Sequence, residues 1–450
     1  MKTITPFALA FALSLRLTSA QEAVSPAPSA SPSRTQAATT ERVVVTAGAV
    51  EQSETDSIEP VTVLNGQDLK RDAGATLGDT LGNQPGVAAS GFTAGASRPV
   101  IRGLADNRVR VLNNGTEVFD VSNLSPDHAP SVSPLLATSI EVVRGPATIL
   151  YGSGAIGGVV NVNDNRIPVE APPNPFGGEA VGRYGSVDNE RSGALSLQIA
   201  PTPHLVFHLD GLLIRTDDRD IPGFALSQRV RDQLPPEVAA GHGFGQNPEG
   251  AVSNTYVRTK EYGIGVSYVW DKGYIGASFS QFLSVYGVPQ DADATVSGDP
   301  QPRVKLDVDK RQWNLRSSIV DPIRGIHNAN LKVVYTDYEH KEIDDNEVGS
   351  TFKTDGVDTR LEIVHEPIGP FEGSFGAQGL LKNLSILGTN AFLQPTQSIE
   401  VAGFLFEEVR LDPVRLQAGV RVEHDGVEID SSDPALTSLT SPDQKQLNFL

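Results

Sequence analysis

The chain contains no cysteine among its 450 residues. This excludes disulfides, thiol catalysis and thiolate metal sites, but it does not fix the cellular compartment. Positive charge is also scarce, because 36 Lys and Arg residues stand against 55 Asp and Glu residues, for a formal net charge of -19. Nucleic-acid binding needs a basic surface, so this balance argues against such a partner. It suits cations or simply solvated loops.

A second absence is any run of about 18 apolar residues that could cross a bilayer as a helix. The first twenty residues, MKTITPFALAFALSLRLTSA, combine Lys2, a shorter apolar stretch and the small residues Thr18-Ser19-Ala20. This pattern predicts a secretory signal peptide over 1–20. The rest of the chain is therefore expected to be exported, and to cross a membrane only with strands.

Residues 21–40 are rich in Ala, Ser, Pro and Thr, and this composition predicts a flexible periplasmic leader. The following segment ERVVVTA, Glu41 to Ala47, reads as extended backbone. It could add to the sheet edge of another protein, or it could be an ordinary first strand. The residues alone leave both interpretations open.

Residues 50–167 predict a compact α+β domain of short strands, short helices and turns. The strands are expected in EPVTVLN, RPVIRGL, NRVRVLNNGTEV and SIEVVRG, and a short helix in GATLGDTL. Asn113-Asn114-Gly115 is a hairpin-type turn signal.

From residue 177 onward, long segments alternate apolar and small or polar residues. In EYGIGVSYVW, the outward face would carry Tyr262, Ile264, Val266, Tyr268 and Trp270. We assign Leu195, Leu197 and Ile199 outward in the same way, as well as Ala402, Phe404 and Phe406. Such segments are typical of transmembrane β-barrel strands, although a large sandwich also alternates. The signal peptide and the aromatic strand ends favour a mainly β, antiparallel transmembrane barrel.

Eleven strands are expected, starting near residues 178, 190, 205, 258, 273, 305, 326, 351, 371, 396 and 414. Tight turns alternate with the long loops 219–254 and 288–304, as in bacterial barrels. Such barrels close with even strand numbers, and the last residues, QLNFL, read as the start of another strand. We therefore expect 177–450 to be the N-terminal part of a truncated barrel, whose open edge would be too costly in lipid.

The segment IEVVRGPATILYGSGAIGGVVNV, Ile140 to Val162, with RPVIRGL and ERVVVTA before it, closely resembles TonB-dependent outer-membrane receptors. The resemblance implies a plug domain inside a barrel of about 22 strands, roughly half of which is present. It also implies a monomer in the outer-membrane lipid of a Gram-negative bacterium. The TonB box, which a periplasmic energy-coupling protein of the TonB type would bind, corresponds to Glu41, Arg42, Val43, Val44, Val45, Thr46 and Ala47.

The segment LSPDHAP, Leu124 to Pro130, resembles a plug loop of the zinc-importing subgroup of this family. The resemblance implies a metal site at Asp127 and His128, with zinc or another divalent cation as transported substrate and no bound cofactor. Imidazole and carboxylate groups are good zinc ligands. Further ligands are expected at His340 and Glu342, which alternate onto one face of a strand. The alternative for this region is a solvated acidic loop.

The chain departs from zinc receptors of this type in lacking long His-rich loops, since its 8 histidines are mostly scattered singly. A ferric siderophore or haem therefore stays open as an alternative cargo. No G-x-S-x-G nucleophile motif occurs, and we expect no enzymatic activity.

Overall fold

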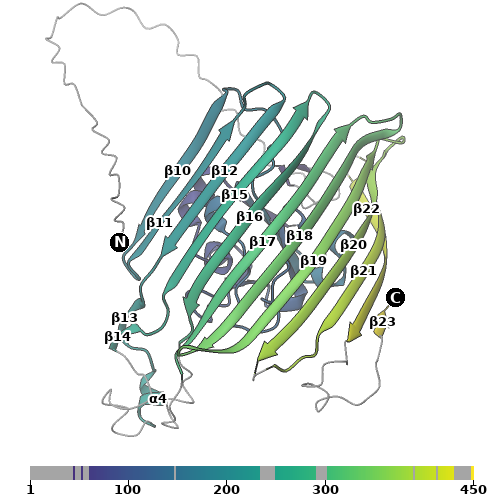
Figure 1. Cartoon of the computed structure of the whole chain (residues 1–450). Coiled ribbons are helices and arrows are strands. Elements are labelled where there is room, and N and C mark those ends of the chain that lie inside the picture. The colour runs from purple at the N-terminus through teal and green to yellow at the C-terminus, as the bar shows by residue number, and fades with distance from the viewer. Residues whose placement is uncertain are drawn as a thin grey trace, which may run out of the picture. The chain divides into compact units, whose positions relative to one another are not determined.

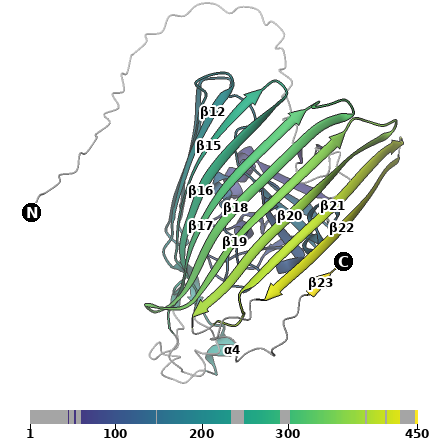
Figure 2. The same cartoon turned by 45° about the vertical axis from the view of Figure 1, so that its right-hand side comes forward.

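The structure, a computed structural model, describes residues 44–45, 52–53, 60–145, 148–233, 249–289, 302–388, 391–411, 414–429 and 447–449. The predicted signal peptide and leader lie outside these ranges. Two bodies of secondary structure dominate: a long, curved antiparallel sheet, and a compact plug packed against its concave side (Figures 1 and 2). Within the described residues, no helix is both long and apolar enough to span a bilayer.

The long sheet has twelve strands, ordered along the chain from β10 to β23. They are β10 (Phe176–Gly185), β11 (Glu190–Ile199), β12 (Leu205–Arg215), β15 (Val257–Trp270), β16 (Gly273–Gly287), β17 (Val304–Val320), β18 (Ile326–Asp344), β19 (Glu347–His365), β20 (Phe371–Gly388), β21 (Thr396–Leu411), β22 (Val414–Ile429) and β23 (Leu447–Phe449). The eleven predicted strands are all present, and β23 forms within the segment QLNFL. We call this sheet the barrel wall.

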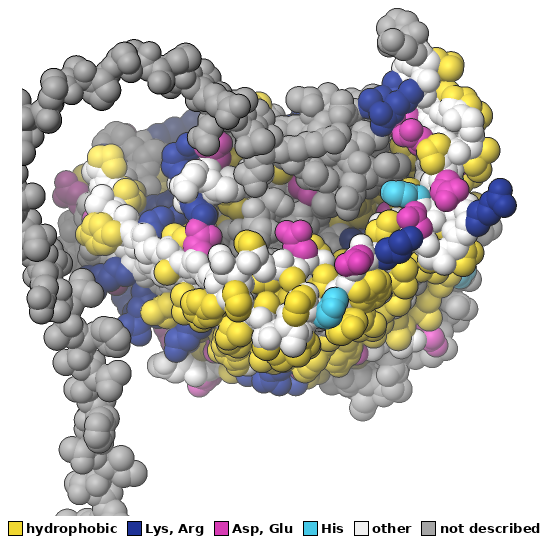
Figure 3. Space-filling model, turned by 90° about the horizontal axis from the view of Figure 1, so that it is seen from above, with side chains coloured by type: hydrophobic (Ala, Val, Ile, Leu, Met, Phe, Trp, Pro, Cys, Tyr) yellow, Lys and Arg dark blue, Asp and Glu magenta, His cyan; other side chains and the backbone are white. Residues whose placement is uncertain are grey.

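The outward face of the wall is apolar, as alternation predicts. On β15, Tyr262, Ile264 and Tyr268 are 46%, 51% and 53% exposed, whereas every second residue between them is buried. Seen from above in Figure 3, hydrophobic side chains cover the convex surface of the wall. Strands that are apolar outside and polar inside suit a barrel in lipid.

The predicted orientation of β21 is wrong. Ala402 and Phe404 are 4% and 5% exposed and face the plug, while Val401 and Leu405 face outward. Phe404 packs with plug residues and lies under the Arg360 guanidinium, 4.5 Å from its ring centroid. Because β21 carries apolar residues at both parities, its period of two could not select the lipid-facing set.

The plug is built on a five-stranded sheet in the order β3-β8-β9-β6-β7, in which only the β6–β9 pair is parallel. Its elements are β3 (Val61–Asn65), α1 (Gly66–Asp72), α2 (Leu77–Leu81), β4 (Val87–Ala89), β5 (Pro99–Ile101), β6 (Val109–Asn113), β7 (Thr116–Glu117), β8 (Ser139–Arg144), α3 (Thr148–Tyr151) and β9 (Gly158–Asn163). The core between sheet and helices includes Leu69, Leu77, Leu81, Ile140 and Val160, each at most 3% exposed.

Three stretches that the sequence singled out can be compared with this fold. Asn114 and Gly115 join β6 to β7 with φ of 52° and 78°, as a hairpin turn of this type requires. The loop 219–254 contains its own hairpin, β13 (Arg219–Phe224) with β14 (Glu249–Val252), and the short helix α4 (Gln228–Arg231). Of the segment Glu41–Ala47, only Val44 and Val45 are described, as strand β1 (Val44–Val45) paired with β2 (Gln52–Ser53).

Arg166, just after β9, anchors the plug to the wall. Its Nε and Nη2 atoms donate to the Asp210 carboxylate at 2.9 and 3.0 Å, and Nη2 donates to Glu261 Oε1 at 2.6 Å. A Cβ added at Gly265 would lie 1.6 Å from the Arg166 carbonyl oxygen, so only glycine permits this approach. The small inward residues of β15 therefore make room for the plug.

Candidate metal centre

The LSPDHAP loop lies between the plug and the inner face of the wall. His128 is 1% exposed, and its Nδ1 atom lies 3.0 Å from the Val121 carbonyl oxygen. A carbonyl only accepts, so Nδ1 carries the proton in that hydrogen bond. In the neutral ring the free lone pair is then on Nε2.

Two carboxylates meet this Nε2 atom. Glu342 Oε1, from strand β18, lies 3.1 Å from it, and Asp127 Oδ1 lies 3.9 Å from it. The ligand atoms of these three residues all lie within 4.8 Å of one another. The Ser125 hydroxyl also donates to Asp127 Oδ1. One imidazole and two carboxylates from plug and wall thus converge, although Glu342 is 214 positions from His128 in the chain.

His340, the fourth predicted ligand, lies beside this group but not within it. Its ring centroid is 4.3 Å from that of His128, and its Nδ1 atom is 3.0 Å from the Tyr338 hydroxyl. The side chain is fully buried, yet Nε2 has no hydrogen-bond partner among the described residues. When Nδ1 donates to Tyr338, Nε2 carries a lone pair available to a cation.

The acidic residues that follow Glu342 do not join the group. Asp344 and Glu347 pair across the tight turn from β18 to β19, and the Asp345 carboxylate accepts from the Arg303 backbone N–H at 3.0 Å. The turn is partly solvated, as the acidic-loop interpretation expects for these residues. The centre itself sits just inside it, near the wall end that carries the long connections after β12 and β16.

Three other described histidines have structural partners. His208 Nε2 lies 3.1 Å from Asp210 in the Arg166 network, and His365 Nε2 lies 3.1 Å from Glu407. His204 Nδ1 is 2.9 Å from the Val269 carbonyl oxygen. None of these three belongs to a group of three candidate metal ligands in the described part of the chain.

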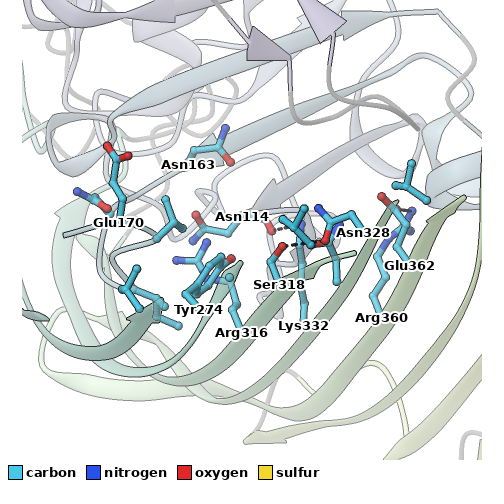
Figure 4. Close-up of a pocket in the computed structure, with 18 of the residues that line it drawn as sticks. Asn114, Asn163, Glu170, Tyr274, Arg316, Ser318, Asn328, Lys332, Arg360 and Glu362 are labelled. Carbon is cyan, nitrogen blue, oxygen red and sulfur yellow. Dashed lines mark hydrogen bonds and ion pairs between the residues drawn. The ribbon is translucent and has the colours of Figure 1, made fainter. Parts of the chain in front are cut away.

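A cavity of about 880 Å³ lies between plug and wall (Figure 4). Its lining includes residues beside the short turns, such as Asp271 and His327, so it lies at the opposite end of the wall from the metal centre. Its cations have partners within the protein. Lys332 Nζ donates to the Asn114 carbonyl oxygen at 2.9 Å, and Arg360 pairs with Glu362 at 3.0 Å. The charged lining is therefore largely satisfied, and the metal centre remains the stronger candidate for cation binding.

Two residues at the centre were not singled out by sequence. Asp120 is buried at the base of the loop, and Tyr286 reaches it from β16. Neither residue belongs to a sequence motif. The alternation of strand β16 also gives no sign that Tyr286 would hydrogen-bond the backbone of Asp127 and Ala129.

Residues 53–159 match the family model described as TonB-dependent Receptor Plug Domain. Among solved structures, the chain is similar to the copper transporter OprC at 14% identity and a TM-score of 0.66, covering 86% of this chain and 59% of OprC. It is also similar to the ferric yersiniabactin uptake receptor FyuA from Yersinia pestis, at 15% identity and a TM-score of 0.56, over 87% of this chain and 60% of FyuA.

A third similar structure is the FrpB iron transporter from Neisseria meningitidis, at 11% identity and a TM-score of 0.61, over 86% of this chain and 60% of FrpB. At these identities the likeness shows the fold alone. The fold is a plug domain against part of a transmembrane β-barrel wall, and the chain spans 59–60% of the length of these three proteins.

Proposed function

We propose that this chain forms the plug and part of the barrel of a TonB-dependent transporter in a Gram-negative outer membrane, and that its cargo is a divalent cation, preferentially zinc. The observation that carries the proposal is the convergence of Asp127, His128 and Glu342 within 4.8 Å. Catalytic zinc sites likewise use three protein ligands and keep one position open for exchange. The chain has no cysteine and one methionine, so soft sulfur ligands for Cu(I) are scarce.

The position of the centre supports capture from outside the cell. Bacterial barrels place their long loops outside and their short turns in the periplasm. The centre lies at the wall end where β12 and β16 end and their long connections begin, beside the turn between β18 and β19. A cation arriving from outside would therefore meet it before reaching the cavity at the other end.

The division of ligands between two bodies suggests how binding is coupled to release. Asp127 and His128 belong to the plug, whereas Glu342 belongs to the wall. Any movement of the plug away from the wall separates these ligands and weakens cation binding. The segment Glu41–Ala47 is the proposed binding site for the TonB-type partner. Its deletion should therefore block import of the cation but leave cation binding unchanged.

The alternative is a receptor for a ferric siderophore or haem. Proteins of similar fold differ in cargo, since OprC is described as a copper transporter and FyuA as a ferric yersiniabactin uptake receptor. Haem ligation by His128 would require its imidazole to be accessible as an axial ligand. His128 is instead 1% exposed, with ring centroids of His340 and Phe352 at 4.3 and 5.0 Å. This packing suits a small cation better than a macrocycle.

The proposal is tested by calorimetric zinc titration of the full-length protein. Wild type should bind a single high-affinity zinc equivalent, and the variant Asp127→Ala/His128→Ala should lose it. Equal zinc affinity in both proteins would refute the metal centre.

A further inference from the structure

The loop that carries Asp127 and His128 is closed at its base by one side chain. The Asp120 carboxylate is buried, with 7% of the residue exposed. Its Oδ1 atom accepts from the backbone N–H and hydroxyl of Ser122 at 3.0 and 2.7 Å. Its Oδ2 atom accepts from the same two groups of Ser131 at 2.9 and 3.2 Å. Asp120 therefore joins the two ends of the loop.

The barrel wall holds the same two ends. Lys382 Nζ, from β20, donates to the Asp120 carbonyl oxygen at 3.4 Å. Lys310 Nζ, from β17, donates to the Ser131 carbonyl oxygen. The base of the loop is thus tied both to itself and to the wall.

The apex of the loop is held by a second side chain from the wall. The Tyr286 hydroxyl donates to the Asp127 carbonyl oxygen at 2.9 Å and accepts from the Ala129 backbone N–H at 3.2 Å. It therefore bonds the main chain on both sides of His128. Tyr286 is 1% exposed and packs so closely on Gly95 that a Cβ there would lie 2.4 Å from it.

We propose that Asp120 and Tyr286 are positioning residues for cation capture, which fix His128 where Glu342 meets it before the cation arrives. The inference rests on the proposed metal-binding function. It adds two residues that do not bind the cation themselves but hold the loop that does. A loop ordered in advance does not have to lose conformational entropy on binding. Groups that hydrogen-bond metal ligands directly typically change metal affinity by about 10- to 100-fold when they are removed. Asp120 and Tyr286 bond the loop that carries two ligands, and we expect an effect within this range.

The test is a Co²⁺ titration of the purified full-length protein, followed by visible d–d absorption, which reports ligand geometry. Tyr286→Phe removes one hydroxyl and Asp120→Asn replaces two acceptors by one. Each is expected to weaken Co²⁺ binding by about 10-fold or more and to alter the d–d bands. The double variant Ser122→Ala/Ser131→Ala, which keeps both backbone donors, should show a smaller loss.

The matched control is Asp358→Asn. Asp358 is a fully buried wall carboxylate that also accepts a plug backbone N–H, from Glu117 at 2.9 Å, but it lies outside the loop. The Co²⁺ affinity and the d–d spectrum of Asp358→Asn should equal those of wild type. A structural role alone would lower unfolding temperatures in all variants without a selective spectral change.

The outcomes separate the two claims. Wild-type affinity and spectrum in both Tyr286→Phe and Asp120→Asn would overturn the positioning role and leave the metal centre intact. A wild-type titration indistinguishable from that of His128→Ala would overturn the metal centre and this inference with it. If Asp120→Asn does not fold, Tyr286→Phe and the serine variant decide the question.

Discussion

The Nε2 atom of His128 in the plug lies 3.1 Å from the Oε1 atom of Glu342 on strand β18 of the wall. The two residues are 214 positions apart in the chain, so the contact exists only when the plug is seated. A cation bound by both residues would therefore be held only while the plug stays in place against the wall.

Replacing Glu342 by glutamine should weaken zinc binding by about 100-fold, because the amide keeps the shape but loses the charge of a ligand. Competition with a chelating dye measures this change. Glu339→Gln is the matched control, since Glu339 lies on the same strand but pairs with Lys341 and Lys353 away from the centre. An equal loss in both variants would point to a general electrostatic effect.

Replacing His340 by leucine should lower zinc affinity and change the unfolding temperature of the cation-free protein only slightly, because removing the buried Nε2 atom offsets the lost hydrogen bond to the Tyr338 hydroxyl. The buried Nε2 atom has no partner among the described residues, and such an atom costs about 1–3 kcal/mol. In contrast, His365→Leu breaks the contact with Glu407 and should lower the unfolding temperature with no effect on zinc. Unchanged zinc affinity in His340→Leu would remove His340 from the ligand set.

Replacing Arg166 by methionine should loosen the plug. It leaves Asp210 and Glu261 buried without their cation, which typically costs about 3–5 kcal/mol. Limited proteolysis of the plug and the unfolding temperature both measure the effect. Arg71→Met is the control, because Arg71 is 67% exposed and its pairs with Asp68 and Asp72 should not matter measurably. Equal protease resistance in wild type and Arg166→Met would contradict the anchor.

Asp164 lies next to Arg166, and its carboxylate should make the stability of the folded protein depend on pH. Burial disfavours the charged carboxylate, but Arg166 and Arg316 outweigh burial and hold the pKa of Asp164 below its ordinary value. A lowered pKa stabilises the folded state above the ordinary value of about 3.9, and this contribution disappears as the pH falls through the lowered value.

The unfolding temperature of wild type should therefore exceed that of Asp164→Asn at pH 5 to 7. This difference should shrink below about pH 4. A difference that instead grows on acidification would have the wrong sign.

The sequence predicted the wall well because lipid and plug impose a period of two on most strands. It predicted the wrong face for Phe404, where both faces of β21 are apolar and the plug decides between them. Glu342 could be predicted as a ligand because it alternates with His340 on one strand, and its place as a ligand stays a prediction. Tyr286 could not, because its partners are backbone groups 157 and 159 residues away.

The most direct measurement is cargo uptake by cells that carry the full-length gene, wild type against Asp127→Ala/His128→Ala. Zinc, copper, haem and a ferric siderophore are offered in parallel, and protein levels in the outer membrane are matched. Zinc accumulation is expected to fall in the variant, and uptake of the other cargoes should not change. Unchanged zinc accumulation, with another cargo entering through the protein, would contradict zinc as the proposed cargo.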